Sequence, residues 1–239
     1  MEKKVETFSD FVKRVSEFEN ENFSFNTNEI LDNQSLKFKV RTDNSFKEFY
    51  GDTVVFDLPS NIKLHIEKIV NDLYSNCSSL FAERLITNTF HMTLHDLNNN
   101  IDLDKVSSDC FISELKCYEI AKSKSIISDT INLKSNFIFN MVNTSLVMGL
   151  IPETEDDFYK LQKLYEHFES VKKLPYPFTP HITLGYFSYN NHKKEQIDIL
   201  FDLIKKYNHD TLHFSINTKD LYYQKFTSMN NYHSIFNFL

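Results

Sequence analysis

Two short strings of this sequence repeat the same residue types, starting at positions 91 and 181. They are His91-Met92-Thr93-Leu94 and His181-Ile182-Thr183-Leu184. On an extended strand side chains alternate between faces, so each histidine shares a face with its threonine, about 7 Å away. Two imidazoles, each beside a hydroxyl donor, can take a proton from one oxygen of a phosphodiester and give one to another. That chemistry uses side chains alone.

The repeat extends to the elements that must position these strings. Apolar runs from Val54 to Leu58 and from Val147 to Ile151 each stop at a proline, Pro59 or Pro152. Apolar residues at helical spacing then follow each proline and precede each string. Each half therefore predicts a strand, a helix and a strand bearing His-x-Thr. Two such units suggest two lobes about an approximate twofold axis, with both histidines facing a cleft.

The paired strings resemble the H-Φ-[ST]-Φ signature of the 2H phosphoesterase superfamily, and the likeness in strand order covers roughly residues 50 to 228. This group includes the bacterial enzymes named as 2′-5′ RNA ligases and the 2′,3′-cyclic phosphodiesterases. The resemblance implies an α+β, bilobal, pseudo-twofold fold with two antiparallel-rich sheets around a central groove and helices outside. It also implies His91 and His181 as acid and base, and Thr93 and Thr183 as donors to phosphate oxygens. Because the acid, the base and the donors are all side chains, we expect no metal or cofactor.

The pattern along the chain predicts an extension at 1–49 and a two-lobed domain at 50–239, with lobes at roughly 50–103 and 140–211 that exchange elements. Apolar residues at helical spacing predict an amphipathic helix within 1–22, packed on one lobe or, alternatively, contacting a partner or second copy. The asparagine-rich stretch 20–34 reads as a loop, and the alternation of Leu36, Phe38 and Val40 as a short strand.

Patterning in the rest of the chain predicts helices at 104–128 and 195–207. Strands are expected at 131–139, 146–151, 212–217 and 221–226.

Composition is that of an ordinary globular protein, with 41% hydrophobic and 25% charged residues. The three cysteines are an odd number without paired spacing, which favours a reducing, cytoplasmic location over a disulfide framework. We expect Cys110 and Cys117 to be small buried residues. No apolar run has the length of a membrane span or marks a secretory signal, so a membrane protein is not expected.

The net charge of −7 limits the substrate classes. Affinity for a long polyanion comes largely from lysine and arginine, and this chain is acidic overall. No long nucleic-acid track is evident, so we expect a small nucleotide or an RNA-terminal phosphodiester. Arg84, Lys172 and Lys173 precede the motif strings and are candidate phosphate cations or ordinary surface residues.

Two tyrosines are candidate substrate-binding residues. Tyr186 follows His181 by five positions, an odd offset that turns it off the histidine face unless a bulge forms near Gly185. A tyrosine at the mouth of the groove could stack a nucleobase. Tyr176, in the Pro175-Tyr176-Pro177 segment, is a weaker candidate.

A metal site is the alternative to this assignment. His95 follows His91 by four positions and on a regular strand would share its face, so His91, His95 and His181 form a conceivable ligand set. No carboxylate or cysteine stands at a recognisable metal spacing, and Asp96 would point away. We therefore expect no metal.

The function predicted is a metal-independent phosphodiesterase for a short, terminal or cyclic nucleotide phosphodiester, with a 2′,3′-cyclic phosphate or a 2′-5′ linkage leading the list. One alternative is a non-catalytic module that binds a nucleotide or RNA end, and another is an interaction protein that works through its N-terminal helix. Two titratable groups flanking one phosphate favour catalysis over binding alone. Oligomeric state, and which histidine is the acid, stay open.

Overall fold

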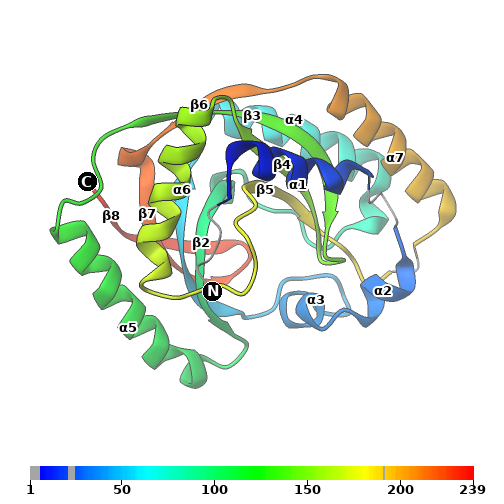
Figure 1. Cartoon of the computed structure of the whole chain (residues 1–239). Helices are drawn as coiled ribbons and strands as arrows, with labels where there is room; N and C mark the ends of the chain where they lie inside the picture. Colours follow the sequence, from blue (N-terminus) through cyan, green and yellow to red (C-terminus); the bar gives the residue numbers. More distant parts are fainter. Residues whose placement is uncertain (1–5, 21–24, 191) are drawn as a thin grey trace.

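The computed structural model describes residues 6–20, 25–190 and 192–239 (Figure 1). At its centre lies a strongly curled antiparallel sheet with the strand order β6-β3-β4-β5-β2-β1-β7-β8. The strands are β1 (Tyr50–Asp57), β2 (His91–Asn100), β3 (Thr130–Met141), β4 (Ser145–Pro152), β5 (His181–Tyr186), β6 (His213–Asn217), β7 (Leu221–Ser228) and β8 (Asn231–Asn237).

The two predicted units are joined through β5 and β2, which pair at Met92 and Ile182. The expected two sheets are thus one continuous sheet, because the motif strands hydrogen-bond to each other instead of facing across a gap. In the order β4-β5-β2-β1, each motif strand is flanked on its other side by the apolar strand of its own unit.

The long helices are α4 (Ser60–Cys77), α5 (Leu103–Lys122), α6 (Glu155–Glu169) and α7 (Lys194–His209). Short 3₁₀ turns lie at Ser78–Leu80, Thr87–Thr89 and Thr218–Asp220. The apolar stripe of α4 and that of α6 are buried, as the helical spacing predicts. No helix in the described ranges combines the length and apolar character that crossing a membrane requires.

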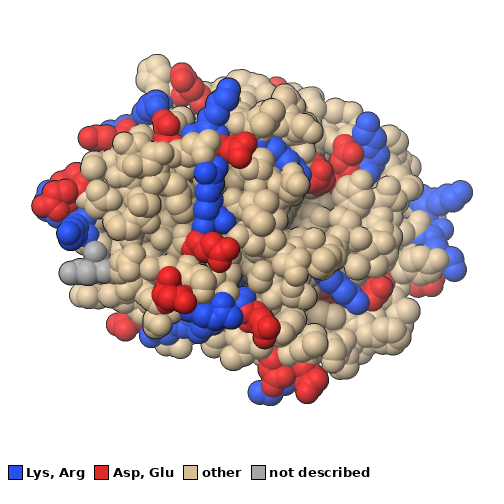
Figure 2. Space-filling view, turned by 180° about the vertical axis from the view of Figure 1, so that it is seen from behind, with Lys and Arg blue, Asp and Glu red and all other residues tan. Residues whose placement is uncertain are grey.

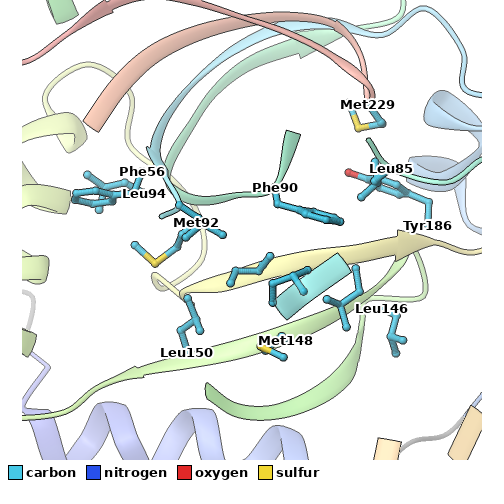
Figure 3. Packing of buried hydrophobic residues seen from close by; sticks show 14 of the residues in the cluster. Phe56, Leu85, Phe90, Met92, Leu94, Leu146, Met148, Leu150, Tyr186 and Met229 are labelled. Carbon is cyan, nitrogen blue, oxygen red and sulfur yellow. The ribbon is translucent and has the colours of Figure 1, made fainter. Parts of the chain in front are cut away.

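The main core lies between the sheet and these helices. Met92 and Leu94 of β2 and Met148 and Leu150 of β4 point into one apolar cluster (Figure 3). Ile182 and Leu184 of β5 belong to the same cluster. The alternate residues of the two motif strands, which include the histidines, therefore face the opposite side of the sheet.

The N-terminal extension is helical over most of its described part. It contains α1 (Phe8–Asn20), α2 (Thr27–Asp32) and α3 (Gln34–Lys39). The predicted loop at 20–34 is wrong where α2 lies, because Asn26 accepts hydrogen bonds from the first turn of that helix. The residues at 21–24 and at 1–5, with Val5 of the predicted stripe, lie outside the described residues.

The short strand predicted at Leu36, Phe38 and Val40 is also wrong. Asn33 caps α3 by accepting from the Leu36 amide. Leu36 and Val40 are buried, whereas Phe38 is exposed. Burial of residues four apart is the period of a helix, and three alternating positions are too few to separate that period from two.

Helix α1 packs within the chain along the stripe predicted for it. Phe11 and Val15 are buried against Ile151 and Phe158, and the ring of Phe18 stacks on that of Phe139 at 4.9 Å. Phe139 pairs with Val147 across β3 and β4, and Val147 pairs with Thr183 of the second motif. Directly opposed residues share a face, so α1 covers part of the side of the sheet that carries the histidines.

Candidate functional site

The two motif strings are brought side by side by the pairing of β2 with β5. Because Met92 lies opposite Ile182 in an antiparallel pair, His91 is the lateral neighbour of Thr183, and Thr93 that of His181. Such neighbours have Cβ atoms about 5 Å apart. We call the side of the sheet carrying these four half-buried residues the histidine face.

Both histidines are oriented by the same local contact. The Nδ1–H of His91 donates to the carbonyl oxygen of Thr89 at 2.7 Å, and that of His181 to the carbonyl oxygen of Thr179 at 2.8 Å. A carbonyl can only accept, so Nδ1 carries the proton and Nε2 keeps a lone pair. The threonine two positions before each histidine extends the sequence repeat, a signal our motif comparison missed.

The reactive atoms of the four motif residues have no partner within the described chain. Neither histidine Nε2 and neither hydroxyl of Thr93 and Thr183 forms a hydrogen bond with any other described residue. These groups are thus available to one bound molecule, with a threonine beside each histidine.

Burial sets the charge of the two histidines. It lowers the pKa of His91 to about 4, against the opposing effect of the hydrogen bond to Thr89, and the nearby His181 lowers it further. Burial likewise lowers the pKa of His181. Both imidazoles are therefore neutral near pH 7 in the free protein, and an anion bound between them would favour protonation of one.

A bulge follows the threonine in both motif strands. Val54 pairs with His95 and Val55 with Thr93, which leaves Leu94 as an extra residue in β2. In β5 the extra residue is Leu184. Each bulge reverses the alternation of faces, so a residue five positions after each histidine returns to the histidine face.

The first bulge overturns our expectations for His95 and Asp96. His95 is 1% exposed and stacks on Tyr165 at 4.9 Å, on the core side of the sheet, so it cannot join His91 and His181 in a metal site. Asp96 is exposed, and its carboxylate raises the pKa of both motif histidines. The site thus includes a carboxylate that we expected to point away.

The second bulge places Tyr186 on the histidine face, as we allowed for, but inside the protein instead of at a mouth. Tyr186 is 8% exposed, with the ring of Phe46 edge-on to its ring at 5.6 Å and the ammonium of Lys39 above the ring at 5.3 Å. On the other motif, Tyr232 of β8 lies beside the ring of His91 at 5.0 Å.

Tyr176 lies at the open edge of the site. It is 51% exposed, and its hydroxyl donates to Oδ2 of Asp96 at 3.1 Å. Burial of the hydroxyl and the neighbouring carboxylate raise the pKa of Tyr176 well above its usual value. This ring has the free surface that Tyr186 lacks.

The cations suggested by the sequence do not act on the charge of the motif histidines. Lys172 donates to the carbonyl oxygen of Leu97 and to Asn98, Arg84 pairs with Glu67 at 3.8 Å, and Lys173 is exposed. The cations that do act on the motif histidines are Lys63 on His91 and Lys39 on His181.

The structure offers no alternative metal or thiol site in the residues it describes. No three histidine, cysteine, aspartate or glutamate side chains of this part gather as metal ligands. Cys77, Cys110 and Cys117 are free and buried, as expected for cysteines that serve as small apolar residues. Burial raises the pKa of Cys77 and of Cys110 to about 12, which keeps both as unreactive thiols.

Comparison with solved structures shows a known fold. ATU0111 from Agrobacterium tumefaciens strain C58, a conserved protein of unknown function, matches over 87% of this chain and 93% of its own, with 14% identity and a TM-score of 0.66. TT0787 from Thermus thermophilus matches over 77% and 94%, with 10% identity and a TM-score of 0.50. E. coli LigT complexed with 3′-AMP matches over 79% and 97%, with 14% identity and a TM-score of 0.47.

No family model matches the chain, and no curated protein matches it in sequence. The chain is similar in fold to ATU0111 and to TT0787, and in its paired motifs it resembles the 2H phosphoesterases.

Proposed function

We propose that this protein is a metal-independent phosphodiesterase that cleaves a short, terminal or cyclic nucleotide phosphodiester, with a 2′,3′-cyclic phosphate or a 2′-5′ linkage as the leading substrates. The observation that carries the proposal is the matched pair of histidines. Each has its Nδ1 fixed on a backbone carbonyl and its Nε2 free, beside a threonine hydroxyl of the other motif. We also propose that the two units, each with one motif strand, form two lobes related by an approximate twofold axis.

The mechanism follows from these roles. One neutral histidine accepts a proton through Nε2 from the attacking water or hydroxyl. The other, protonated when the anionic substrate binds, gives its proton to the leaving oxygen. Thr93 and Thr183 donate to the nonbridging oxygens, where negative charge increases in the transition state. Because each histidine has the same type of neighbour, either can serve as acid, depending on the direction in which the substrate lies.

Two features support a short substrate. Helix α1 covers the histidine face over β3 and β4, next to the second motif, so that side is not free for a polynucleotide. The net charge is −7, and on the face shown in Figure 2 basic and acidic side chains of the described residues are interspersed, without a continuous basic band. Tyr176, at the open edge beside Asp96, is our candidate for stacking a base.

The test is hydrolysis by the purified protein of 2′,3′-cyclic AMP and of 2′-5′-linked diadenosine monophosphate, with products identified by phosphorus NMR. We expect turnover that persists in excess EDTA and falls at least ~100-fold in His91→Ala and in His181→Ala. Wild-type activity in either folded variant contradicts the assignment. Binding of these molecules without turnover identifies the protein as a non-catalytic module.

A further inference from the structure

Lys39 is a lysine of the N-terminal extension whose charge is unneutralised beside the histidine face. It is the last residue of α3 and is half-buried. Its Nζ lies 5.3 Å from the ring centroid of Tyr186 and 5.5 Å from that of Phe49. No carboxylate of the described residues lies within 4.0 Å of it, and its ammonium donates no hydrogen bond within this part of the chain.

The other lysines near the site are already engaged. Nζ of Lys63 lies 2.6 Å from Oδ1 of Asp57 and also donates to the carbonyl oxygen of Asn88. Lys172 donates to the carbonyl oxygen of Leu97. The contacts that Lys39 makes with described residues are to two ring faces, and such contacts stabilise an ammonium without using its hydrogen-bond donors, which leaves these donors available to a ligand.

Lys39 is close to the second motif in particular. Tyr186, under its ammonium, is the last residue of the strand that begins with His181, and the bulge at Leu184 returns Tyr186 to the histidine face. The charge of Lys39 lowers the pKa of His181. The contact with Tyr186 places the ammonium on the side of the sheet where the free Nε2 atoms lie, and the effect on His181 agrees with that placement.

The extension around Lys39 is fastened at several points. Leu36 and Val40 belong to the main core, and Phe46 packs against Tyr186. The side-chain amide nitrogen of Asn33 donates to the carbonyl oxygen of Val142 at 2.7 Å, which ties the start of α3 to the β3–β4 turn. The backbone that carries Lys39 is therefore held in place before any ligand arrives, which lowers the cost of ordering the site on binding.

We propose that Lys39 binds the substrate phosphate, donating to a nonbridging oxygen on the His181 side of the site. This assignment rests on the proposed function and names a binding group that lies outside both motif units. The N-terminal extension then completes the site. The ligand class is an anion with a tetrahedral phosphate, whose oxygens would supply the partners that the ammonium lacks.

The first measurement is titration of inorganic phosphate into the full-length protein by calorimetry, because it needs no turnover. We expect Lys39→Gln to weaken phosphate binding about 10-fold or more, the usual size for loss of a charge-assisted hydrogen bond. Lys39→Arg should stay within about 3-fold of wild type, since it keeps a cationic donor. Lys37→Gln, on the same helix with the same charge change, should bind phosphate as the wild type does.

The second measurement is kcat/KM for 2′,3′-cyclic AMP in the same variants, which should fall in parallel with phosphate affinity.

Wild-type phosphate binding by Lys39→Gln overturns the assignment of Lys39, while histidine-dependent hydrolysis would leave the proposed function standing. Lys39-dependent phosphate binding without hydrolysis supports the assignment and overturns the function. If the wild type neither binds phosphate nor hydrolyses the diester, both are overturned. Should Lys39→Gln unfold, Lys39→Met keeps an apolar stem over Tyr186 and serves instead.

Discussion

The residues to which we assign the chemistry are held by backbone contacts, so their geometry depends little on other side chains. Each motif histidine donates to a carbonyl two positions before it, and each motif threonine is set beside the other motif by the register of β2 and β5. Side chains fixed in this way need little reorganisation when a substrate binds, which is the basis of electrostatic stabilisation in enzymes.

The threonine hydroxyls give the first prediction at this scale. Thr93→Val and Thr183→Val keep the branched shape and remove the donor, so we expect each to lower kcat by about 100-fold, the usual effect of losing one such donor. The measurement is steady-state hydrolysis of 2′,3′-cyclic AMP. Thr53→Val, which removes a hydroxyl that bonds the carbonyl of His95, is the control and should leave kcat near wild type. Unfolding of both motif variants would show that their role is structural.

Asp96 gives a prediction about pH. Its carboxylate raises the pKa of His91 and of His181, so Asp96→Asn lowers both values further. The bell-shaped profile of kcat/KM, whose limbs belong to the coupled pair, should therefore move to lower pH, with a several-fold loss of activity at pH 7. Tyr176→Phe removes the hydrogen bond to Asp96 but keeps the charge, and should shift the profile much less. An unchanged profile in Asp96→Asn contradicts this role.

At the scale of residues, the sequence predicted which residue types form the candidate site, but not the side of the sheet on which each of them lies. His91, Thr93, His181 and Thr183 lie on one face because alternation holds up to each threonine. Beyond each threonine, a bulge reverses the alternation of faces. We considered a bulge near Gly185, where a glycine marks it, and not at Leu94, where no residue type does. Asp96 was missed for that reason, and His95 was misplaced.

At the scale of elements, the long periodic segments were predictable and the short ones were not. Helices α4 and α6 have four or more turns of apolar spacing, which leaves no ambiguity of period. Helices α2 and α3 have six residues each and begin with asparagine caps in a stretch whose composition resembles a loop. Strand β8 was missed because its side chains are mostly exposed and show no apolar alternation.

Helix α1 acts on the second motif through Arg14. Its guanidinium donates to the hydroxyl of Thr179 at 3.1 Å and to the carbonyl oxygen of Phe178 at 2.9 Å, while Glu6 holds it from the other side at 2.7 Å. The carbonyl of Thr179 orients His181. The extension thus supports the residues that position a motif histidine.

This contact predicts a graded effect. Arg14→Met should lower kcat by about 10-fold with little change in KM, because a small displacement of a catalytic group slows chemistry more than it weakens binding. Lys13→Met, an exposed neighbour with the same charge change, should behave as wild type. Steady-state kinetics of both variants with 2′,3′-cyclic AMP provides the comparison. Equal rates for Arg14→Met and wild type would show that α1 does not influence His181.

At the scale of the molecule, the features that the sequence did not reveal are contacts between distant segments. The joining of the two units into one sheet depends on the pairing of Met92 with Ile182, and the placement of Lys39 on the packing of residues 33–46 against β5 and the β3–β4 turn. Periodicity reports which face of an element is buried, and not which element buries it. These contacts follow from the assembled fold alone.

The stability of the folded protein also depends on pH. Burial lowers the pKa of His91, His95, His181 and His192 below the value of about 6.5 expected in the unfolded chain. The unfolded chain therefore binds more protons than the folded protein below that pH. The stabilisation is fully present above pH 6.5 and decreases as the pH falls toward the folded values, which for His91 is about 4.

We therefore expect the free energy of unfolding to fall between pH 7 and pH 5, by at most about 1.4 kcal/mol per pH unit for each such histidine. His95→Phe separates this effect from catalysis, because His95 lies on the core side of the sheet against Tyr165 and a phenyl ring keeps that stacking. Urea unfolding at a series of pH values should show a smaller loss in His95→Phe than in wild type. His233→Gln, an exposed site on β8, should follow the wild-type curve. If His95→Phe loses stability on acidification as steeply as wild type, the buried ring of His95 is not a source of the pH dependence.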